Sequence, residues 1–307
     1  MKNKKEFIGY LQSRDLAQSS IKSYSKLVQF FLTWYKADPI NCTKKDVLNY
    51  LSYLKENTNQ SNASRRQSIT ALNHYFTALV QADITTQNPV ALIKLRGTNK
   101  KRLYKIYTPD ELTELADNFY SFYISGFDDS YMKFPTKKLR SKLARHRNYT
   151  MLTFLLYQGL PTNELSTITL NDIDMTKARI SLKKGNRTLP IQATQMGTLI
   201  YYLNEIRPQF LDFCGQTEKL FFSLCPQQYN KNFSSPLRRL TRQVKSIDPK
   251  FVNFSQTRAS VITHWIQTEG LRKAQYLAGH KTIASTEEYL PNDLDSLKSD
   301  IQRFNPF

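Results

Sequence analysis

Apolar side chains that recur every three or four residues restrict the fold of this 307-residue chain more than any other feature. A period near 3.6 residues places such side chains along one face of a helix, which must then be buried against other helices. The clearest example comprises Ile21, Tyr24, Val28, Phe31, Leu32 and Tyr35. Shorter stripes follow at residues 47–54 and 69–80. The first 95 residues therefore predict a compact domain of four or five helices.

Capping signals give approximate starting points for these helices. Ser19 or Ser20 is expected to cap the first long stripe. Thr43 followed three residues later by Asp46 predicts a capping box, and Ser64 is expected to cap the next helix after a polar loop.

A basic segment separates this region from a second domain. Residues 94–102 contain five lysines or arginines, a composition equally compatible with a solvated connector and with a nucleic-acid contact. Thr108, Pro109 and Glu111 then combine a cap, a proline at the first helical position and a capping-box glutamate. The sequence thus predicts a helical N-terminal domain, a basic linker and a second domain at residues 1–95, 96–106 and 107–307.

The second domain is predicted to be mostly helical with one small sheet. An apolar helix is expected from Arg145 to Tyr157, and residues 179–191 have the form of a β-hairpin around Gly185-Asn186. Helical patterns resume near residue 193. Residues 120–140 are rich in aromatic and charged side chains and look like an insertion of unassigned role. The predicted fold class is mainly α, with a small antiparallel β-sheet.

The charge balance indicates a polyanionic partner. The chain has 44 Lys and Arg against 25 Asp and Glu, which gives a formal charge of +19. Self-repulsion at this charge destabilises a compact state, and binding a polyanion offsets it. No apolar run approaches the roughly 18 residues of a membrane span. Nucleic acid is therefore favoured over a membrane surface.

Cysteine and histidine usage argues against a metal site. The three cysteines, Cys42, Cys214 and Cys225, are odd in number and form no C-x-x-C pair, and the chain has only four histidines. This pattern favours neither a disulfide framework nor a zinc centre. It is typical of a protein in the reducing cytoplasm.

The last sixty residues contain three spaced elements. They are Ser255-Gln-Thr-Arg258, then Leu277-Ala-Gly-His280, then Tyr289, nine residues after the histidine. Here the sequence resembles the tyrosine recombinase (phage integrase) family, which has a His-x-x-Arg box, a Leu-Gly-His element and a nucleophilic tyrosine at this spacing. A single tyrosine among 18 carries no such information.

The resemblance extends over most of the chain. Gly159-Leu160 with Glu164-Leu165 looks like the first catalytic box of the family, and Lys184 lies in a segment that looks like its catalytic β-hairpin. The N-terminal region looks like the core-binding domain that clamps duplex DNA together with the catalytic domain. The resemblance also implies cleavage without a metal or nucleotide cofactor.

Each matched residue acquires a role by resemblance. Tyr289 would displace a 5′-hydroxyl at phosphorus and leave a 3′-phosphotyrosyl link. Arg258 would bind the non-bridging phosphate oxygens through its planar fork. Lys184 would protonate the leaving oxygen. His280 would donate a hydrogen bond to the phosphate or orient its neighbours.

Two positions depart from the family pattern. Pro161 replaces the first catalytic arginine, and Ser255 replaces the histidine of His-x-x-Arg, so Ser255 supplies at most one hydrogen bond. We interpret the chain as an active but non-standard enzyme similar to mobile-element integrases that lack the first arginine. A catalytically impaired DNA-binding regulator is the alternative. Residues that could substitute for the missing cation are Arg145, Arg147, Lys183, Arg187 and Arg272.

Basic clusters predict the phosphate contacts. They contain Arg65, Arg66, Lys94, Arg96, Lys100, Lys101, Arg102, Arg238, Arg239 and Arg242. Neutralisation of phosphates by these side chains predicts affinity for double-stranded DNA that falls steeply with salt. Such contacts carry no information on the DNA sequence that is recognised.

An apolar stripe ends the chain, at Leu294, Leu297, Ile301 and Phe304. It is compatible with a tail helix that docks on its own domain. The resemblance implies instead a helix donated to a neighbouring subunit, in an assembly of four protomers on DNA. The predicted function is integration or excision of a bacterial mobile element. A type IB topoisomerase shares the chemistry, but the separate helical N-terminal domain disfavours it.

Overall fold

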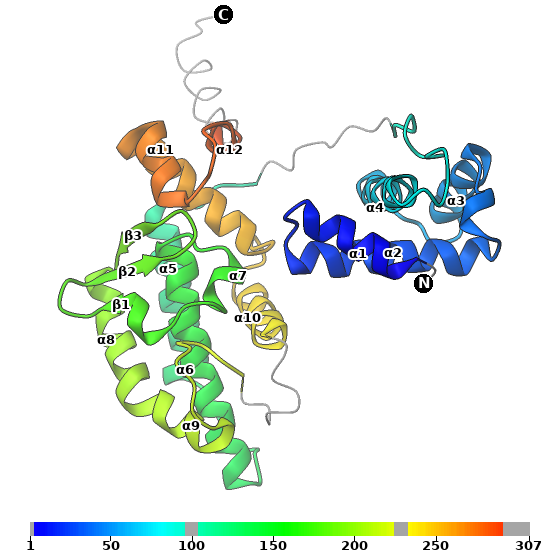
Figure 1. Cartoon of the computed structure of the whole chain (residues 1–307). Coiled ribbons are helices and arrows are strands. Elements are labelled where there is room, and N and C mark those ends of the chain that lie inside the picture. The colour runs from blue at the N-terminus through cyan, green and yellow to red at the C-terminus, as the bar shows by residue number, and fades with distance from the viewer. Residues whose placement is uncertain (1–2, 96–103, 224–232, 291–307) are drawn as a thin grey trace, which may run out of the picture. The chain divides into compact units, whose positions relative to one another are not determined.

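The computed structural model describes residues 3–95, 104–223 and 233–290 (Figure 1). The chain divides into two compact units, Met1–Lys101 and Arg102–Phe307. This division falls inside the segment predicted to be a linker. None of the helices in the described ranges is both long enough and apolar enough to cross a membrane.

The first unit is a helical domain around an aromatic core. Phe31 meets Tyr50 edge to face with ring centroids 5.1 Å apart, and Phe7 meets Tyr75 in the same way at 5.4 Å. All four rings are buried, which places the predicted apolar stripes inside the domain. Its elements are α1 (Lys4–Ser13), α2 (Gln18–Tyr35), a 3₁₀ turn (Pro39–Asn41), α3 (Lys44–Glu56) and α4 (Asn62–Gln81).

Two of the three predicted helix starts in this unit were wrong. Thr43 and Asp46 form the expected capping box at α3. Helix α2 begins earlier, after Ala17, which has no side chain able to cap it. Helix α4 begins at Asn62, because the hydroxyl of Ser61 accepts from the backbone N–H of Ser64. Ser64 is therefore inside the first turn, and its amide is the group that is capped.

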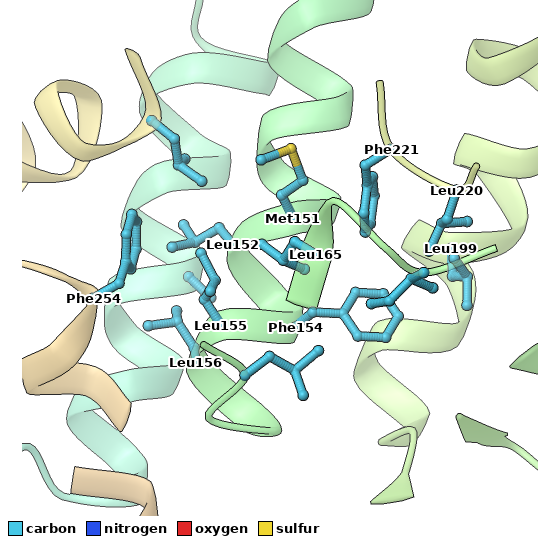
Figure 2. Packing of buried hydrophobic residues seen from close by; sticks show 14 of the residues in the cluster. Met151, Leu152, Phe154, Leu155, Leu156, Leu165, Leu199, Leu220, Phe221 and Phe254 are labelled. Carbon is cyan, nitrogen blue, oxygen red and sulfur yellow. The ribbon is translucent and has the colours of Figure 1, made fainter. Parts of the chain in front are cut away.

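The second unit is built around α6, whose last turns are surrounded by other elements. Met151, Leu152, Phe154, Leu155 and Leu156 are all buried, and Figure 2 shows them packed together with side chains from other elements. The α-helices of this unit are α5 (Pro109–Tyr120), α6 (Pro135–Tyr157), α7 (Thr162–Leu165), α8 (Ala193–Tyr201), α9 (Arg207–Cys214), α10 (Ser234–Ile247), α11 (Phe254–Ala278) and α12 (Ala284–Glu287).

Of the first two helix starts predicted for the second unit, one is confirmed and the other was wrong. Thr108 and Glu111 form the predicted capping box of α5. Helix α6 begins at Pro135, ten residues before the predicted start. Polar and basic residues of its first turns hide the helical period, whereas Pro135 at the first helical position fixes its start. The predicted insertion thus contains a π-helical turn (Ser121–Ser125), a short connection and the start of α6.

The predicted hairpin is confirmed and forms part of a three-stranded antiparallel sheet. The strands β1 (Ile173–Asp174), β2 (Arg179–Leu182) and β3 (Arg187–Pro190) are hydrogen-bonded in that order. Ile180 and Leu189 point into the core, as the two-residue period of a strand requires. The fold is mainly helical with a small sheet, as predicted.

Candidate active site

Helix α11 is folded back on itself, and this brings distant residues together. Gly270 interrupts it with φ 78° and ψ 163°, a backbone conformation that only glycine adopts easily. In a straight helix the 20 residues from Arg258 to Ala278 would span about 30 Å. Instead, Nη2 of Arg258 donates a 2.8 Å hydrogen bond to the carbonyl oxygen of Ala278. The bend therefore places the two ends of the matched motif in one site.

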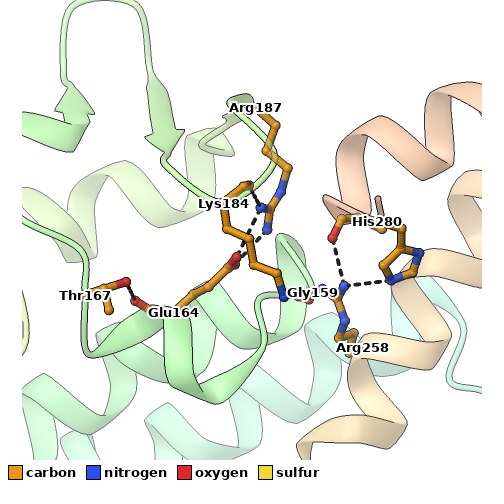
Figure 3. Close-up of polar contacts among 8 residues, drawn as sticks. Gly159, Glu164, Thr167, Lys184, Arg187, Arg258 and His280 are labelled. Atoms are coloured by element: carbon orange, nitrogen blue, oxygen red, sulfur yellow. Dashed lines mark hydrogen bonds and ion pairs between the residues drawn. The ribbon is translucent and has the colours of Figure 1, made fainter. Parts of the chain in front are cut away.

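Arg258 is held by neutral partners. Its Nη1 donates to the carbonyl of Gly159 at 2.6 Å, and its Nη2 lies 3.1 Å from Nε2 of His280 (Figure 3). Burial lowers the pKa of the guanidinium, while the nearby Tyr289 hydroxyl and Glu164 carboxylate act in the opposite direction. The side chain is fixed in place, and its positive charge is not matched by a direct ion pair among the described residues.

His280 is neutral and has a defined tautomer in this arrangement. Burial, followed by the charges of Arg258, Lys184 and Arg187, lowers its pKa to about 4. Because Arg258 can only donate, Nε2 accepts from it. The proton is then on Nδ1, which lies 2.9 Å from the hydroxyl of buried Thr286. His280 therefore orients Arg258 in the free protein.

Tyr289 lies directly against this pair. Its ring stacks on that of His280, with centroids 5.7 Å apart and an angle of 13° between the planes. It follows α12, where a hydrogen bond from its amide to the Thr286 carbonyl at 3.0 Å fixes the backbone. The same imidazole lies 3.1 Å from Nη2 of Arg258. The predicted nucleophile and the predicted phosphate-binding arginine thus share one site.

Lys184 reaches the site from the sheet. It stands in the connection between β2 and β3, where Gly185 has φ 77° and Asn186 has φ 43°. Figure 3 shows its side chain extending from the hairpin toward Gly159 and Arg258. The backbones of Gly185 and Gly279 are in contact, since a Cβ added to Gly185 would lie 3.0 Å from Cα of Gly279. The hairpin therefore lies against the turn that precedes His280.

Ser255 sits in the first turn of α11, one turn before Arg258. Its amide, like that of Gln256, is capped by the side chain of Asn253, at 2.9 Å for Ser255. Ser255 is exposed. A residue three positions before Arg258 lies on the same helix face, so its hydroxyl faces the same side as the guanidinium.

Arg187 was one of five candidates to replace the missing arginine, and it lies in the site, but its charge is paired with a buried carboxylate. It forms a bidentate ion pair with Glu164, at 3.1 Å and 2.7 Å, and also donates to the carbonyl of Lys184. Glu164 belongs to α7, which begins directly after Pro161. Arg187 and Leu189 lie two residues apart in β3 and therefore face the same side of the strand, toward the core. This two-residue period was a sequence signal that Arg187 is buried.

The other four candidates lie elsewhere or are solvated. Arg145 stacks on the ring of Phe127 at 3.6 Å and bonds to Ser141 within α6. Arg147 donates to the carbonyl of Phe222. Lys183 and Arg272 are exposed. Within the described ranges, Arg187 is the candidate that contacts the predicted catalytic residues.

The predicted DNA contacts fall into three groups. Arg238, Arg239 and Arg242 are exposed on α10, and Arg66 and Lys94 are exposed in the first unit. Arg65 differs from the expectation, because it is buried and its guanidinium donates to Leu51 and Asn62. Arg96, Lys100, Lys101 and Arg102 lie outside the described residues, as does the apolar tail after residue 290.

Comparison with known proteins covers both units. Residues 5–86 match the phage integrase N-terminal SAM-like domain, and residues 129–294 match the phage integrase family. The tyrosine recombinase XerD of Rickettsia bellii is 26% identical over 94% of this chain and 93% of its own. The tyrosine recombinase XerC of Psychromonas ingrahamii is 27% identical over 95% and 92%.

Solved structures show the same fold. XerH site-specific recombinase, bound to a palindromic difH substrate, has a TM-score of 0.68 at 17% identity, covering 95% of this chain and 81% of its own. The Tn1549 transposon integrase, in complex with circular intermediate DNA, has a TM-score of 0.62 at 16% identity, covering 98% and 99%. With more than half of the chain matched to the family, this protein belongs to the phage integrase family of tyrosine recombinases, the enzymes of site-specific DNA recombination.

Proposed function

We propose that this chain cuts and rejoins duplex DNA with Tyr289 as its nucleophile, in the integration or excision of a mobile element. The observation that carries the proposal is the convergence of Arg258, His280 and Tyr289, which three separate segments bring into contact. The guanidinium of Arg258, which has no direct ion pair among the described residues, supplies a fixed positive charge for a phosphodiester.

The chemical step follows from these positions. The Tyr289 oxygen bonds to phosphorus as its proton leaves to water, and the bond from phosphorus to the 5′ oxygen breaks. The departing oxygen takes a proton from the Lys184 ammonium, and the 3′-phosphotyrosyl link conserves the bond for rejoining. Arg258 stabilises the charge that develops on the non-bridging oxygens. His280, with a pKa of about 4, orients Arg258 rather than acting as a base.

Ser255 is proposed as a further donor to the phosphate. It is exposed on the same face of α11 as Arg258. A hydroxyl donates one hydrogen bond and carries no charge. Ser255 and Pro161 therefore leave the site with fewer cationic groups than the family pattern, and the enzyme is expected to be slow.

The test is the formation of a covalent adduct. Purified protein is mixed with nicked suicide duplexes made from the DNA that flanks its own gene, and adducts are resolved on a denaturing gel. An adduct with the wild type and none with Tyr289→Phe would support the proposal. Binding to these duplexes without any adduct would refute it and indicate a regulator that has kept only the fold.

DNA binding is proposed to use the exposed clusters of both units. Arg238, Arg239 and Arg242 present three positive charges on α10, and Arg66 and Lys94 add two in the first unit. Each phosphate contact contributes about 0.9 to the slope of log affinity against log salt. Replacing the three arginines of α10 with glutamine is expected to lower the slope by about 2–3, and an unchanged slope would remove them from the interface.

The assembly is proposed to contain four protomers and two duplexes. Each chain supplies one Tyr289, and exchange of strands between two duplexes requires four cleavages. Coupling between subunits through the tail of residues 291–307 remains part of this proposal. Native mass measurement of the DNA complex, with and without the tail, tests it. We also propose that the reaction takes place in the cytoplasm, where the free thiols of Cys42 and Cys214 stay reduced.

A further inference from the structure

Three segments of the site meet at one buried guanidinium. The side chain of Arg187 has no exposed surface, and that of its partner Glu164 is 7% exposed. The fork of Arg187 is occupied by both oxygens of that carboxylate, and Nη1 also donates to the carbonyl of Lys184. Figure 3 shows these contacts linking α7 to the hairpin.

The third segment is the turn that carries His280. Gly279 has φ 68°, and a Cβ added there would collide with Nη1 and Cζ of Arg187. The guanidinium therefore packs directly under this turn, where only a glycine leaves room for it. The hairpin is held to the same region by the amide of Thr188, which donates to the hydroxyl of Tyr276 at 3.1 Å.

We propose that Arg187 is a positioning residue, which fixes the Lys184 hairpin against the His280 turn and so holds the general acid at the scissile phosphate. The inference rests on the proposed function of Lys184 and Tyr289. A guanidinium that is fully buried and paired with a carboxylate does not reach a DNA phosphate. Arg187 acts by hydrogen-bonding the backbone carbonyl of Lys184, which fixes the backbone position from which the flexible lysine side chain extends.

The ion pair also connects the segment that follows Pro161 to the hairpin. Glu164 lies three residues after Pro161 and binds a guanidinium that comes from the hairpin. The ion pair ties the segment that contains Gly159, an acceptor for Arg258, to the segment that carries Lys184. The two cationic groups assigned to the phosphate are thereby fixed relative to one another.

The test uses the identity of the leaving group. A 5′-bridging sulfur leaves as a thiolate, because thiols ionise near pH 8.5, and so it needs no general acid. Loss of a general acid slows cleavage of the ordinary substrate by about 10²–10⁴-fold. A residue that acts through Lys184 should therefore be rescued by sulfur, whereas one that binds the phosphate should not.

The variants separate positioning from folding. Glu164→Leu with Arg187→Met removes both buried charges and leaves neither unpaired, and Arg187→Lys keeps the charge but loses the fork. Arg179→Met changes an exposed arginine on the same hairpin and serves as the matched control. Lys184→Ala is the reference for a variant whose cleavage rate the 5′-bridging sulfur restores. Arg258→Lys is the reference for a variant whose rate it does not restore. All are made in the full chain and assayed on the nicked duplex that gives an adduct with the wild type.

The expected result is a loss of about 10²-fold on the oxygen substrate for the double variant, with sulfur restoring the rate to within about threefold of wild type. Arg179→Met should behave as wild type. Two outcomes would overturn the proposal. One is an unchanged rate on the oxygen substrate, and the other is an equal loss on both substrates in a protein that is folded.

Amide hydrogen exchange provides a second readout that needs no DNA. In the double variant, residues 183–187 and 279–281 are expected to exchange at least tenfold faster, while α8 is unchanged. Unchanged exchange at these residues would refute the positioning role. If wild type forms no adduct on any duplex, the proposed function fails, and the exchange measurement still decides whether Arg187 holds the hairpin.

Discussion

Arg258, which is partly buried, and Arg187, which is fully buried, lie in the same site and differ in what surrounds their charge. Arg258 donates to two backbone carbonyls and lies against a neutral imidazole. Arg187 is neutralised by the carboxylate of Glu164. A buried charge is costly unless an opposite charge accompanies it. We therefore propose that the guanidinium without an ion pair binds the anionic substrate and that the ion-paired one belongs to the scaffold.

The largest effect is expected when the scaffold pair is broken. Glu164→Leu leaves the charge of Arg187 buried alone and should lower the free energy of unfolding by about 3–5 kcal/mol. Adding Arg187→Met should recover most of that loss. Unfolding of the second unit can be followed by the fluorescence of Trp265 in a Trp34→Phe background, since the chain has two tryptophans. A double variant as unstable as Glu164→Leu alone would show that an unpaired Arg187 charge is not the cause of the lost stability.

The next effect concerns the uncompensated arginine. Arg258→Lys keeps a positive charge but loses the bidentate fork, so adduct formation should slow by about 10²–10³-fold. Its stability should change less than that of Glu164→Leu, because no opposite charge is stranded. Rates come from single-turnover cleavage of the nicked duplex. Normal cleavage together with a large loss of stability would reverse the roles assigned to the two arginines.

A smaller effect tests the contact between Arg187 and the His280 turn. Gly279→Ala introduces a methyl group at positive φ and against the guanidinium, and should cost about 1–3 kcal/mol. Gly197→Ala is the matched control, because Gly197 lies in α8 with open space around it. That change should stabilise the protein by up to about 1 kcal/mol. Equal effects of the two substitutions on stability would contradict close packing of Arg187 against Gly279.

The smallest effect is a dependence of stability on pH. The pKa of His280 is lowered to about 4 from an ordinary value of 6.5, mainly by burial and then by Arg258. The unfolded chain therefore binds more protons between these values, and stability should fall as pH drops from about 6.5 toward 4. His280→Gln should flatten part of this slope. The pKa of His146 is also lowered to about 4, mainly by burial. His146→Gln is therefore the matched substitution away from the site.

The proximity of several candidate site residues could be predicted from their spacing in the sequence, because short rigid elements connect them. The interval from His280 to Tyr289 is bridged by a short turn and α12, so chain distance limits spatial distance. The capping boxes at Thr43 and Thr108 were also predictable, since each depends on four consecutive residues. Arg65 was not, because its burial depends on where α3 presents the Leu51 carbonyl.

The sequence by itself determined the family, the helical stripes and the hairpin, and it supplied the residues that we propose as the reactive groups. These depend on local periodicity and on the order of residues along the chain. Only the tertiary structure decided that Gly270 folds α11 back and that Arg187 pairs with Glu164 beneath Gly279. The physical reason is that the environment of a charge is set by segments distant in sequence, and that environment distinguishes the ion-paired Arg187 from Arg258, which has no direct ion pair among the described residues.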